Sequence, residues 1–306
     1  MNHIVFGGTG LLGSSLVRSV DTALSVSSKS FDATNQMSTK QWFLENRDLV
    51  ENSRAYICSG VVAGIVGQKN MKMFRDNALI AINLLECLSK YQKEGHTVYY
   101  SSSCIYPRDM NNFAEDDLLK GVFEPSNEGY ALGKACGQKY CEYLNEVHGH
   151  RKFLTIVPPN LYGPNDNWDL ATSHVLPALT QKIYRAKVEG VDKLELMGNP
   201  TIRREFIRSD DIANATHFVL DNDTDTEVIN IGQGTDVSLQ DIVDELSVRI
   251  GYTGRIEFNN TMGGKKQKLM SVKKQESLGW TPQYNYKDMF DFMVGELYKR
   301  NDKEES

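Results

Sequence analysis

The amino-acid sequence predicts an α/β protein in which a doubly wound parallel sheet precedes a smaller mixed α/β domain. Strand-like and helix-like stretches alternate along the first half of the 306 residues, a pattern typical of parallel strands joined by crossover helices. A glycine-rich turn after the first apolar run and a turn-rich stretch near the middle of the chain support the same interpretation. The strands after the first are predicted at 23–26, 55–58, 97–101 and 153–157.

The first strand, Ile4 to Phe6, runs directly into a turn with the spacing Gly-x-x-Gly-x-x-Gly. The first two glycines would let the backbone turn tightly and approach a pyrophosphate, and the third would let helix and strand pack closely. The N–H groups at the start of the following helix can donate to the same anion. This arrangement predicts a Rossmann-type dinucleotide site whose contacts include Gly7, Gly8, Thr9, Gly10, Leu11, Leu12 and Gly13.

We expect two domains, because the strand and helix patterns loosen after Asn160 to Pro164 into a stretch rich in Asn, Gly and Asp. The predicted division is a dinucleotide-binding domain at 1–162 and a substrate domain at 163–306, with segments around 204–233 able to return to the first. The stretch from Asn77 to Leu88 is apolar over much of its circumference and predicts a buried helix. Its Asn77 could serve structure alone or the site as well.

Charge and cysteine content exclude several classes of protein. The chain carries 34 Lys and Arg against 40 Asp and Glu, a net charge of −6, whereas a general nucleic-acid binder needs a basic footprint. No apolar stretch is long enough to cross a bilayer, so we expect a cytoplasmic protein with no membrane partner. The five cysteines are odd in number and lack Cys-x-x-Cys spacing, which predicts neither disulfides nor a metal site.

Tyr130 and Lys134 stand four residues apart, with Ser102 upstream, and together they resemble the catalytic apparatus of short-chain dehydrogenases. Residues i and i+4 share one face of a helix, so the Lys134 ammonium can favour the phenolate of Tyr130. Tyr130 would then serve as an acid or base at neutral pH. The alternative is an ordinary amphipathic helix with Tyr and Lys on its surface.

The tip of the second strand bears on the choice of dinucleotide. An Asp or Glu there would bind the adenosine ribose of NAD, whereas this chain has the hydroxyl of Ser28 followed by the cation Lys29. Such a pair accepts a 2′-phosphate and therefore predicts NADP(H), unless Lys29 is only a solvated loop residue. Ser59, Gly60 and Val62 follow the third strand, where the dinucleotide should pass.

Five further segments resemble GDP-L-fucose synthases, a family of extended short-chain dehydrogenases. They are Ser102 to Pro107, Glu124 to Glu128, Asn160 to Pro164, Ser173 to Leu179 and Arg204 to Phe206, and the resemblance runs from the glycine turn to about Trp280. The family epimerises GDP-4-keto-6-deoxymannose at C3 and C5 and reduces it at C4 with NADPH. The resemblance implies the same activity here, a GDP-sugar substrate, and a homodimer formed through a helix pair.

The resemblance also implies roles for individual residues. Cys104 would be the base and His174 the acid of the epimerisation, two groups with suitable titration ranges. Tyr130 would donate a proton to the C4 oxygen, Ser102 would hydrogen-bond that oxygen, and Lys134 would hold the ribose and the Tyr130 charge. Further implied cofactor contacts are Pro158, Asn160, Leu161 and His174, and implied substrate contacts are Ser103, Asn160, Lys182, Met197, Arg204 and Ser271.

Two departures, at Met197 and Ser271, leave the substrate open, and a third, at Thr9, weakens the prediction of NADP(H). Met197 stands where the family commonly has tryptophan, Ser271 where it commonly has aspartate, and Thr9 where an arginine often lies near the cofactor phosphate. The alternatives are a C4 reductase that does not epimerise and acts on a related GDP-4-keto sugar, such as a heptose or dideoxyhexose, or a nucleotide-sugar 4-epimerase. A non-catalytic protein that senses NADP(H) is the remaining alternative.

Overall fold

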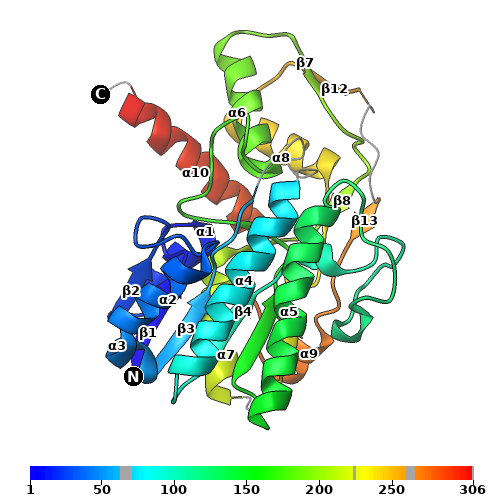
Figure 1. Ribbon diagram of the computed structural model, residues 1–306. Coiled ribbons are helices and arrows are strands. Elements are labelled where there is room, and N and C mark those ends of the chain that lie inside the picture. The colour runs from blue at the N-terminus through cyan, green and yellow to red at the C-terminus, as the bar shows by residue number, and fades with distance from the viewer. Residues whose placement is uncertain (63–70, 223–224, 260–265, 305–306) are drawn as a thin grey trace.

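A parallel sheet of six strands forms the centre of the protein (Figure 1). The computed structural model describes residues 1–62, 71–222, 225–259 and 266–304. The strand order across the sheet is β2-β1-β3-β4-β5-β10, and every neighbouring pair is parallel. The strands are β1 (Asn2–Phe6), β2 (Ala23–Val26), β3 (Ser53–Ile57), β4 (Thr97–Tyr100), β5 (Phe153–Val157) and β10 (Val228–Asn230). The predicted α/β fold with a Rossmann-type sheet is confirmed.

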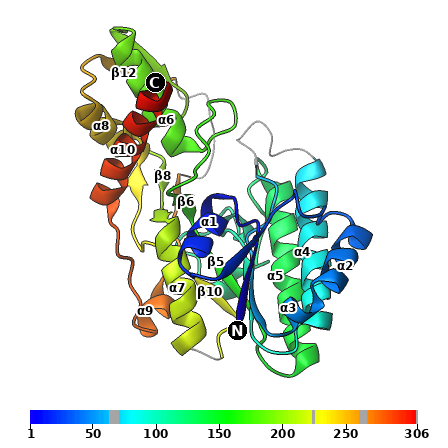
Figure 2. The same ribbon diagram turned by 90° about the vertical axis from the view of Figure 1, so that its left-hand side faces the viewer.

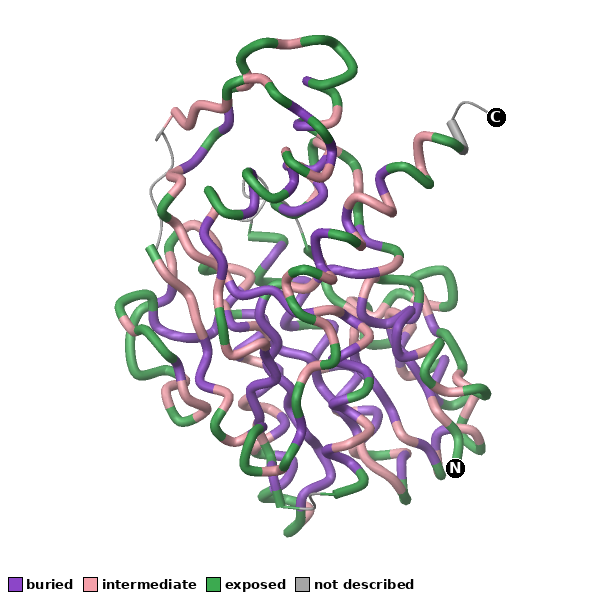
Figure 3. Tube along the Cα trace, turned by 180° about the vertical axis from the view of Figure 1, so that it is seen from behind, coloured by how far each residue is buried: buried purple, intermediate pink, exposed green. Residues whose placement is uncertain are grey.

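Helices cover both faces of this sheet (Figure 2). One face carries α2 (Gln36–Glu45), α3 (Arg47–Glu51), α4 (Met71–Tyr91) and α5 (Glu128–His148), and the other carries α1 (Leu11–Arg18) and α7 (Ser209–Asn222). Successive residues of a strand point to opposite faces, so Ile4 and Phe6 belong to one apolar core and Val5 to the other. Buried residues accordingly run through the strands and the helices against them (Figure 3).

The order of the strands reverses between β1 and β3. The chain passes from β1 outward to β2 and then crosses back to β3 on the other side of β1. In open α/β sheets, ligands bind at the carboxyl ends of the strands where the order reverses in this way. The glycine turn after β1 and the segment beginning at Cys58 after β3 flank that position.

The rest of the chain forms smaller sheets around a separate apolar core. The core lies among α6 (Val175–Val188), α8 (Leu239–Ile250) and α10 (Tyr286–Glu304). The remaining paired strands are β6 (Asn160–Tyr162) with β9 (Phe206–Arg208), β7 (Lys193–Leu196) with β12 (Arg255–Phe258), and β8 (Arg203–Arg204) with β11 (Val237–Ser238) and β13 (Gln267–Lys268). The short helix α9 (Lys273–Ser277) precedes α10.

The segment around 204–233 divides between these structures. β10 pairs with β5 at the edge of the large sheet, whereas β8 and β9 pair with strands outside it. The division at 162 into a dinucleotide domain and a substrate domain stays a prediction. Within the described part of the chain, we find no helix whose length and apolar character would let it cross a membrane.

Candidate active site

The glycine turn packs closely against the end of β3. Gly7 has a φ of +84°, and a Cβ at this position would lie 2.7 Å from the backbone nitrogen of Ser59. A Cβ at Gly13 would lie 2.1 Å from the carbonyl oxygen of Gly7, so only glycine lets α1 approach the turn. Gly10 is the N-cap of α1 and lacks a side chain that could cap the helix. This bare helix start beside a close-packed turn fits a dinucleotide pyrophosphate.

The tip of β2 lies beside the same turn. The N–H groups of Gly7 and Gly8 donate to the carbonyl of Val26, at 2.7 and 3.2 Å. Ser28 and Lys29, which follow in the chain, are exposed. Their side chains are therefore accessible to a ligand that extends from the glycine turn past β2.

The side chain of Asn77 hydrogen-bonds the backbone of the segment that follows β3. Its side-chain amide accepts a hydrogen bond from the N–H of Val61, at 3.1 Å, and donates to the carbonyl of Val61, at 3.0 Å. A Cβ at Gly60 would lie 2.9 Å from Oδ1 of Asn77 and 3.3 Å from Nζ of Lys134. Asn77 thus positions the backbone of a predicted cofactor segment, a function that the sequence pattern left open.

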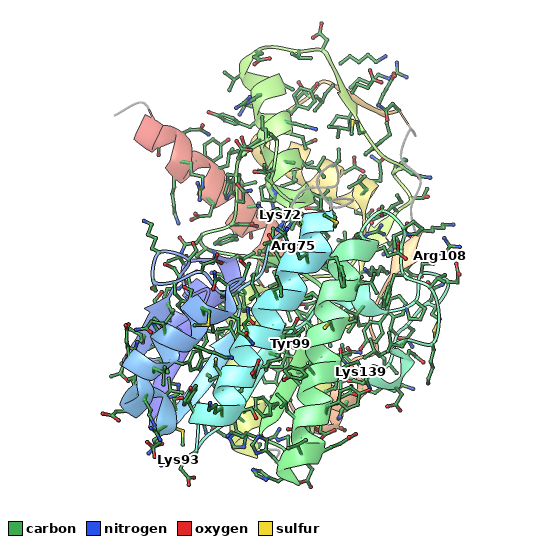
Figure 4. All side chains as sticks on the ribbon, in the orientation of Figure 1. Lys72, Arg75, Lys93, Tyr99, Arg108 and Lys139 are labelled. Atoms are coloured by element: carbon green, nitrogen blue, oxygen red, sulfur yellow. The ribbon has the colours of Figure 1, made fainter. Side chains whose placement is uncertain are left out.

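The Lys134 ammonium lies deep in the protein between β4 and α5. It donates to the carbonyl of Tyr100, at 2.9 Å, and lies 5.3 Å from the centroid of the Tyr99 ring. Tyr99, labelled in Figure 4, projects from β4 so closely against α5 that a Cβ at Gly137 would lie 2.4 Å from its hydroxyl. Burial lowers the pKa of Lys134 to about 8, and the Cys58 thiol acts in the opposite direction.

Tyr130, Ser102 and Cys104 meet where β4 ends. Burial raises the pKa of Tyr130 well above its ordinary value, the Cys104 sulfur acts in the same direction, and a hydrogen bond with Ser102 opposes them. The Ser102 hydroxyl also accepts from the N–H of Cys104, at 3.3 Å. We expected Lys134 to favour a Tyr130 phenolate, but the buried surroundings favour the neutral phenol, because desolvation penalises the charged form. A neutral phenol is suited to donate a proton.

Two side chains that the sequence did not single out contact Cys104. Its Sγ accepts from Nδ2 of Asn127, at 3.0 Å, and lies 3.4 Å from Nζ of Lys268. Burial lowers the pKa of Arg204, whereas the negative charges of Cys104 and Glu124 raise it. The sulfur therefore faces an amide donor and an ammonium, groups that can stabilise negative charge on it. Asn127 lies in the quoted Glu124 to Glu128 segment, which was the available signal for it.

His174 begins α6 as its N-cap residue, and its side chain is 47% exposed. Its Nδ1 lies 3.9 Å from Oδ1 of Asp166, whose carboxyl group is buried. Burial raises the pKa of Asp166, and the nearby charges of His174 and Arg300 oppose that shift. His174 thus has an accessible imidazole, and the buried carboxyl group of Asp166 lies near its Nδ1.

The other predicted contacts divide by exposure. The Ser103 N–H donates to the carbonyl of Pro158, at 3.0 Å, and both residues are buried. Ser271 is also buried, and its N–H donates to Phe113, at 2.7 Å. These two serines offer little side-chain surface to a substrate. The predicted contacts with exposed side chains are Val62, Asn160, Lys182 and Met197, while Leu161 and Arg204 are partly exposed.

Family comparison assigns this chain to a class of enzymes. Over residues 3–232 the chain matches the NAD dependent epimerase/dehydratase family, and it belongs to that family. Within it, the chain belongs with the GDP-L-fucose synthases, as the sequence motifs predicted. The GDP-L-fucose synthase of Sinorhizobium fredii is 33% identical over 287 residues, which cover 91% of this chain and 89% of that protein.

Two solved structures from Campylobacter jejuni show the same fold over nearly the whole chain. A GDP-6-OMe-4-keto-L-xylo-heptose reductase superposes with a TM-score of 0.86 at 25% identity, covering 98% of each chain. A GDP-mannoheptose C4 reductase with NADP bound has a TM-score of 0.85 at 26% identity, covering 97% of this chain and 98% of that one.

Proposed function

We propose that the protein epimerises a GDP-4-keto-6-deoxy sugar at C3 and C5 and reduces it at C4 with NADPH. The observation that carries this proposal is the meeting of Tyr130, Ser102 and Cys104 at the end of β4. One site then contains both Tyr130, which can donate a proton to a carbonyl oxygen, and the Cys104 thiol, which lies among hydrogen-bond donors. The family relationship to GDP-L-fucose synthases supports the substrate class.

The first reaction exchanges protons on the sugar ring. A ketone at C4 acidifies the C–H bonds at C3 and C5, because the carbanion formed there is an enolate. Cys104 removes such a proton as thiolate, with Asn127 and Lys268 beside the sulfur. His174 returns a proton from the opposite side of the ring, which inverts the centre.

The second reaction reduces the ketone. The glycine turn, Lys29, Gly60 and Lys134 would hold the dinucleotide, and the uncapped start of α1 at Gly10 would face its pyrophosphate. When bound, NADPH supplies the hydride for C4. Tyr130 donates its phenolic proton to the C4 oxygen, and Ser102 hydrogen-bonds both groups.

A second candidate is C4 reduction without epimerisation. The Campylobacter jejuni reductases match this chain along almost its full length and act on heptose derivatives, according to their names. Met197, which is exposed and departs from the fucose synthase pattern, also favours a different sugar. No comparable observation favours a 4-epimerase, and a protein that only senses NADP(H) would have no need of Tyr130 and Ser102.

The test is to incubate the purified protein with GDP-4-keto-6-deoxymannose and NADPH in deuterated water. We expect NADPH consumption and a product that carries deuterium at C3 and C5, read by NMR and mass. NADPH consumption without deuterium would support the reductase instead. If nothing is consumed, the same assay with GDP-4-keto-heptoses decides whether the substrate or the whole activity is wrongly assigned.

Lys134 predicts how cofactor affinity depends on pH. Because burial lowers its pKa to about 8, the ammonium loses its proton, and its attraction for the dinucleotide, as the pH rises through that value. We expect NADPH to bind about tenfold more weakly at pH 9.5 than at pH 6.5, measured by fluorescence titration. Lys134→Met should bind weakly at both values. An equal pH dependence in this variant would assign the effect to another group.

We also propose a cytoplasmic homodimer. On α5, Leu132, Cys136, Tyr140, Tyr143 and Val147 follow one another at spacings of three or four residues, so they share one face of the helix. Tyr143 and Val147 are 56% and 81% exposed, respectively. The helix itself lies beside α4 (Figure 1), and a second copy could cover the exposed part of this stripe.

A further inference from the structure

The carboxyl group of Glu205 is completely buried, with an exposed fraction of 0%. Its partners are backbone amides. Oε1 accepts from the N–H of Gly234, at 2.9 Å, and Oε2 accepts from the N–H of Met270, at 3.1 Å. A Cβ at Gly232 would lie 2.4 Å from Oε1, so only glycine leaves room for this carboxylate. The surrounding loops are therefore shaped around Glu205.

Glu205 joins segments that are distant in the sequence. It lies between β8 and β9, and its own carbonyl accepts from Nδ2 of Asn160, at 2.8 Å. Its side chain also binds the backbone of the loop at 232–234 and of the segment at 268–271. One residue thus connects the start of β6, two loops and the strand pair that contains Arg204.

The connected segments carry the groups that surround Cys104. Lys268, two residues before Met270, places its ammonium 3.4 Å from the sulfur. Arg204 directly precedes Glu205, and its guanidinium is close enough to Cys104 for the sulfur charge to raise its pKa. Displacement of the backbone at Glu205 would therefore move both cations relative to the thiol.

We propose that Glu205 is a positioning residue of the active site, whose carboxylate holds the backbone on either side of it so that Arg204 and Lys268 face Cys104. The effect of this positioning on turnover rests on the proposed function. The carboxylate does not touch the sulfur itself, and it acts through the N–H groups that it fixes. Such preorganisation decides how well a site is held in its productive geometry.

The carboxyl group of Glu205 has a pKa close to neutral pH. Burial raises its pKa to about 7, the backbone hydrogen bonds act against that shift, and the charge of Asp236 adds to it. Asp236 and Tyr286 are the titratable groups facing it from neighbouring segments. Because desolvation outweighs the hydrogen bonds, the folded protein favours the neutral acid, so protonation as the pH falls through about 7 relieves the cost of the buried charge.

The test compares Glu205→Gln with a matched control, Gln275→Leu. Gln275 is also buried, and it hydrogen-bonds the backbone of Gly232 through its Oε1, at 2.9 Å, and its Nε2, at 3.2 Å. Among the described residues, neither of these two bonds involves Met270. In Glu205→Gln, an amide NH₂ must face an N–H donor. We expect the KM for the sugar nucleotide to rise about tenfold, the cost of one such hydrogen bond, with the KM for NADPH unchanged.

A second readout needs no substrate. Alkylation of Cys104 by iodoacetamide should be about tenfold slower in Glu205→Gln, because the Lys268 charge no longer stabilises the thiolate. Peptide mass spectrometry measures the rate. Gln275→Leu should lower the Tm but keep both the KM and the alkylation rate.

Two results would overturn the proposal. One is a Glu205→Gln protein with wild-type KM and Cys104 reactivity, and the other is equal losses in Gln275→Leu, which would reduce Glu205 to a loop-stabilising residue. A wild type that turns over no 4-keto nucleotide sugar would instead refute the proposed function. The alkylation rates would still decide the role of Glu205 in that case.

Discussion

Replacement of Tyr130 by phenylalanine is expected to slow C4 reduction about a thousandfold and to leave deuterium exchange at C3 and C5 intact. The phenol is the proton donor to the C4 oxygen, and burial keeps it in the neutral form that can donate. Phenylalanine keeps the ring and removes only the hydroxyl that bonds Ser102. NADPH oxidation measures the first reaction, and deuterium in the recovered keto sugar measures the second.

Tyr143→Phe is the matched control, because Tyr143 lies on the same helix but is 56% exposed. It should retain both activities. A Tyr130→Phe protein that reduces the ketone at the wild-type rate would show that another group or water donates the proton. Loss of deuterium exchange together with reduction would instead mean that Tyr130 also serves the epimerisation, or that the substrate is no longer bound.

Replacement of Cys104 by alanine should have the complementary effect. We expect deuterium exchange at C3 and C5 to fall at least a hundredfold, because no other thiol is placed between Asn127 and Lys268 among the described residues. Reduction should persist with a 4-keto sugar that already has the product configuration at C3 and C5. Exchange followed by NMR, and NADPH oxidation on that second substrate, separate the two effects.

Cys136→Ala tests whether the loss is specific, since Cys136 is a half-buried thiol on α5 that is not among the predicted catalytic residues. It should behave as the wild type. If Cys104→Ala still exchanges both protons, the base is another residue. If the wild type itself exchanges none but reduces the ketone, Cys104 is a remnant of the family pattern and the reductase function stands.

Local sequence was sufficient for five of the six strands of the large sheet, whereas β10 lies in the segment around 204–233 whose place was left open. The predicted strands at 23–26 and 153–157 have the same bounds in the structure, and those at 55–58 and 97–101 differ by one or two residues at their ends. Strands buried on both faces read as short apolar runs, and the glycine turn is recognisable because its spacing reflects steric needs within a few residues. Tyr130, Ser102 and Cys104 were predicted from motifs, and the structure brings them together.

Other features depended on contacts between distant segments. Lys268 reaches Cys104 across 164 residues of chain, and Glu205 binds Met270 across 65, so no local spacing could indicate either pair. The favoured protonation state of Tyr130 also differed from expectation. Desolvation depends on which groups cover a side chain, and the spacing of four residues between Tyr130 and Lys134 contains no information about those groups.

The sequence by itself therefore determined the fold class, the dinucleotide turn and the chemical groups at the end of β4, because each is encoded by residues near one another in the chain. The tertiary structure alone decided which side chains surround the Cys104 sulfur, which protonation state burial favours at Tyr130, and how Glu205 connects the loops around the site. These properties arise from desolvation and from hydrogen bonds between separate segments, and such forces act only once the chain has folded.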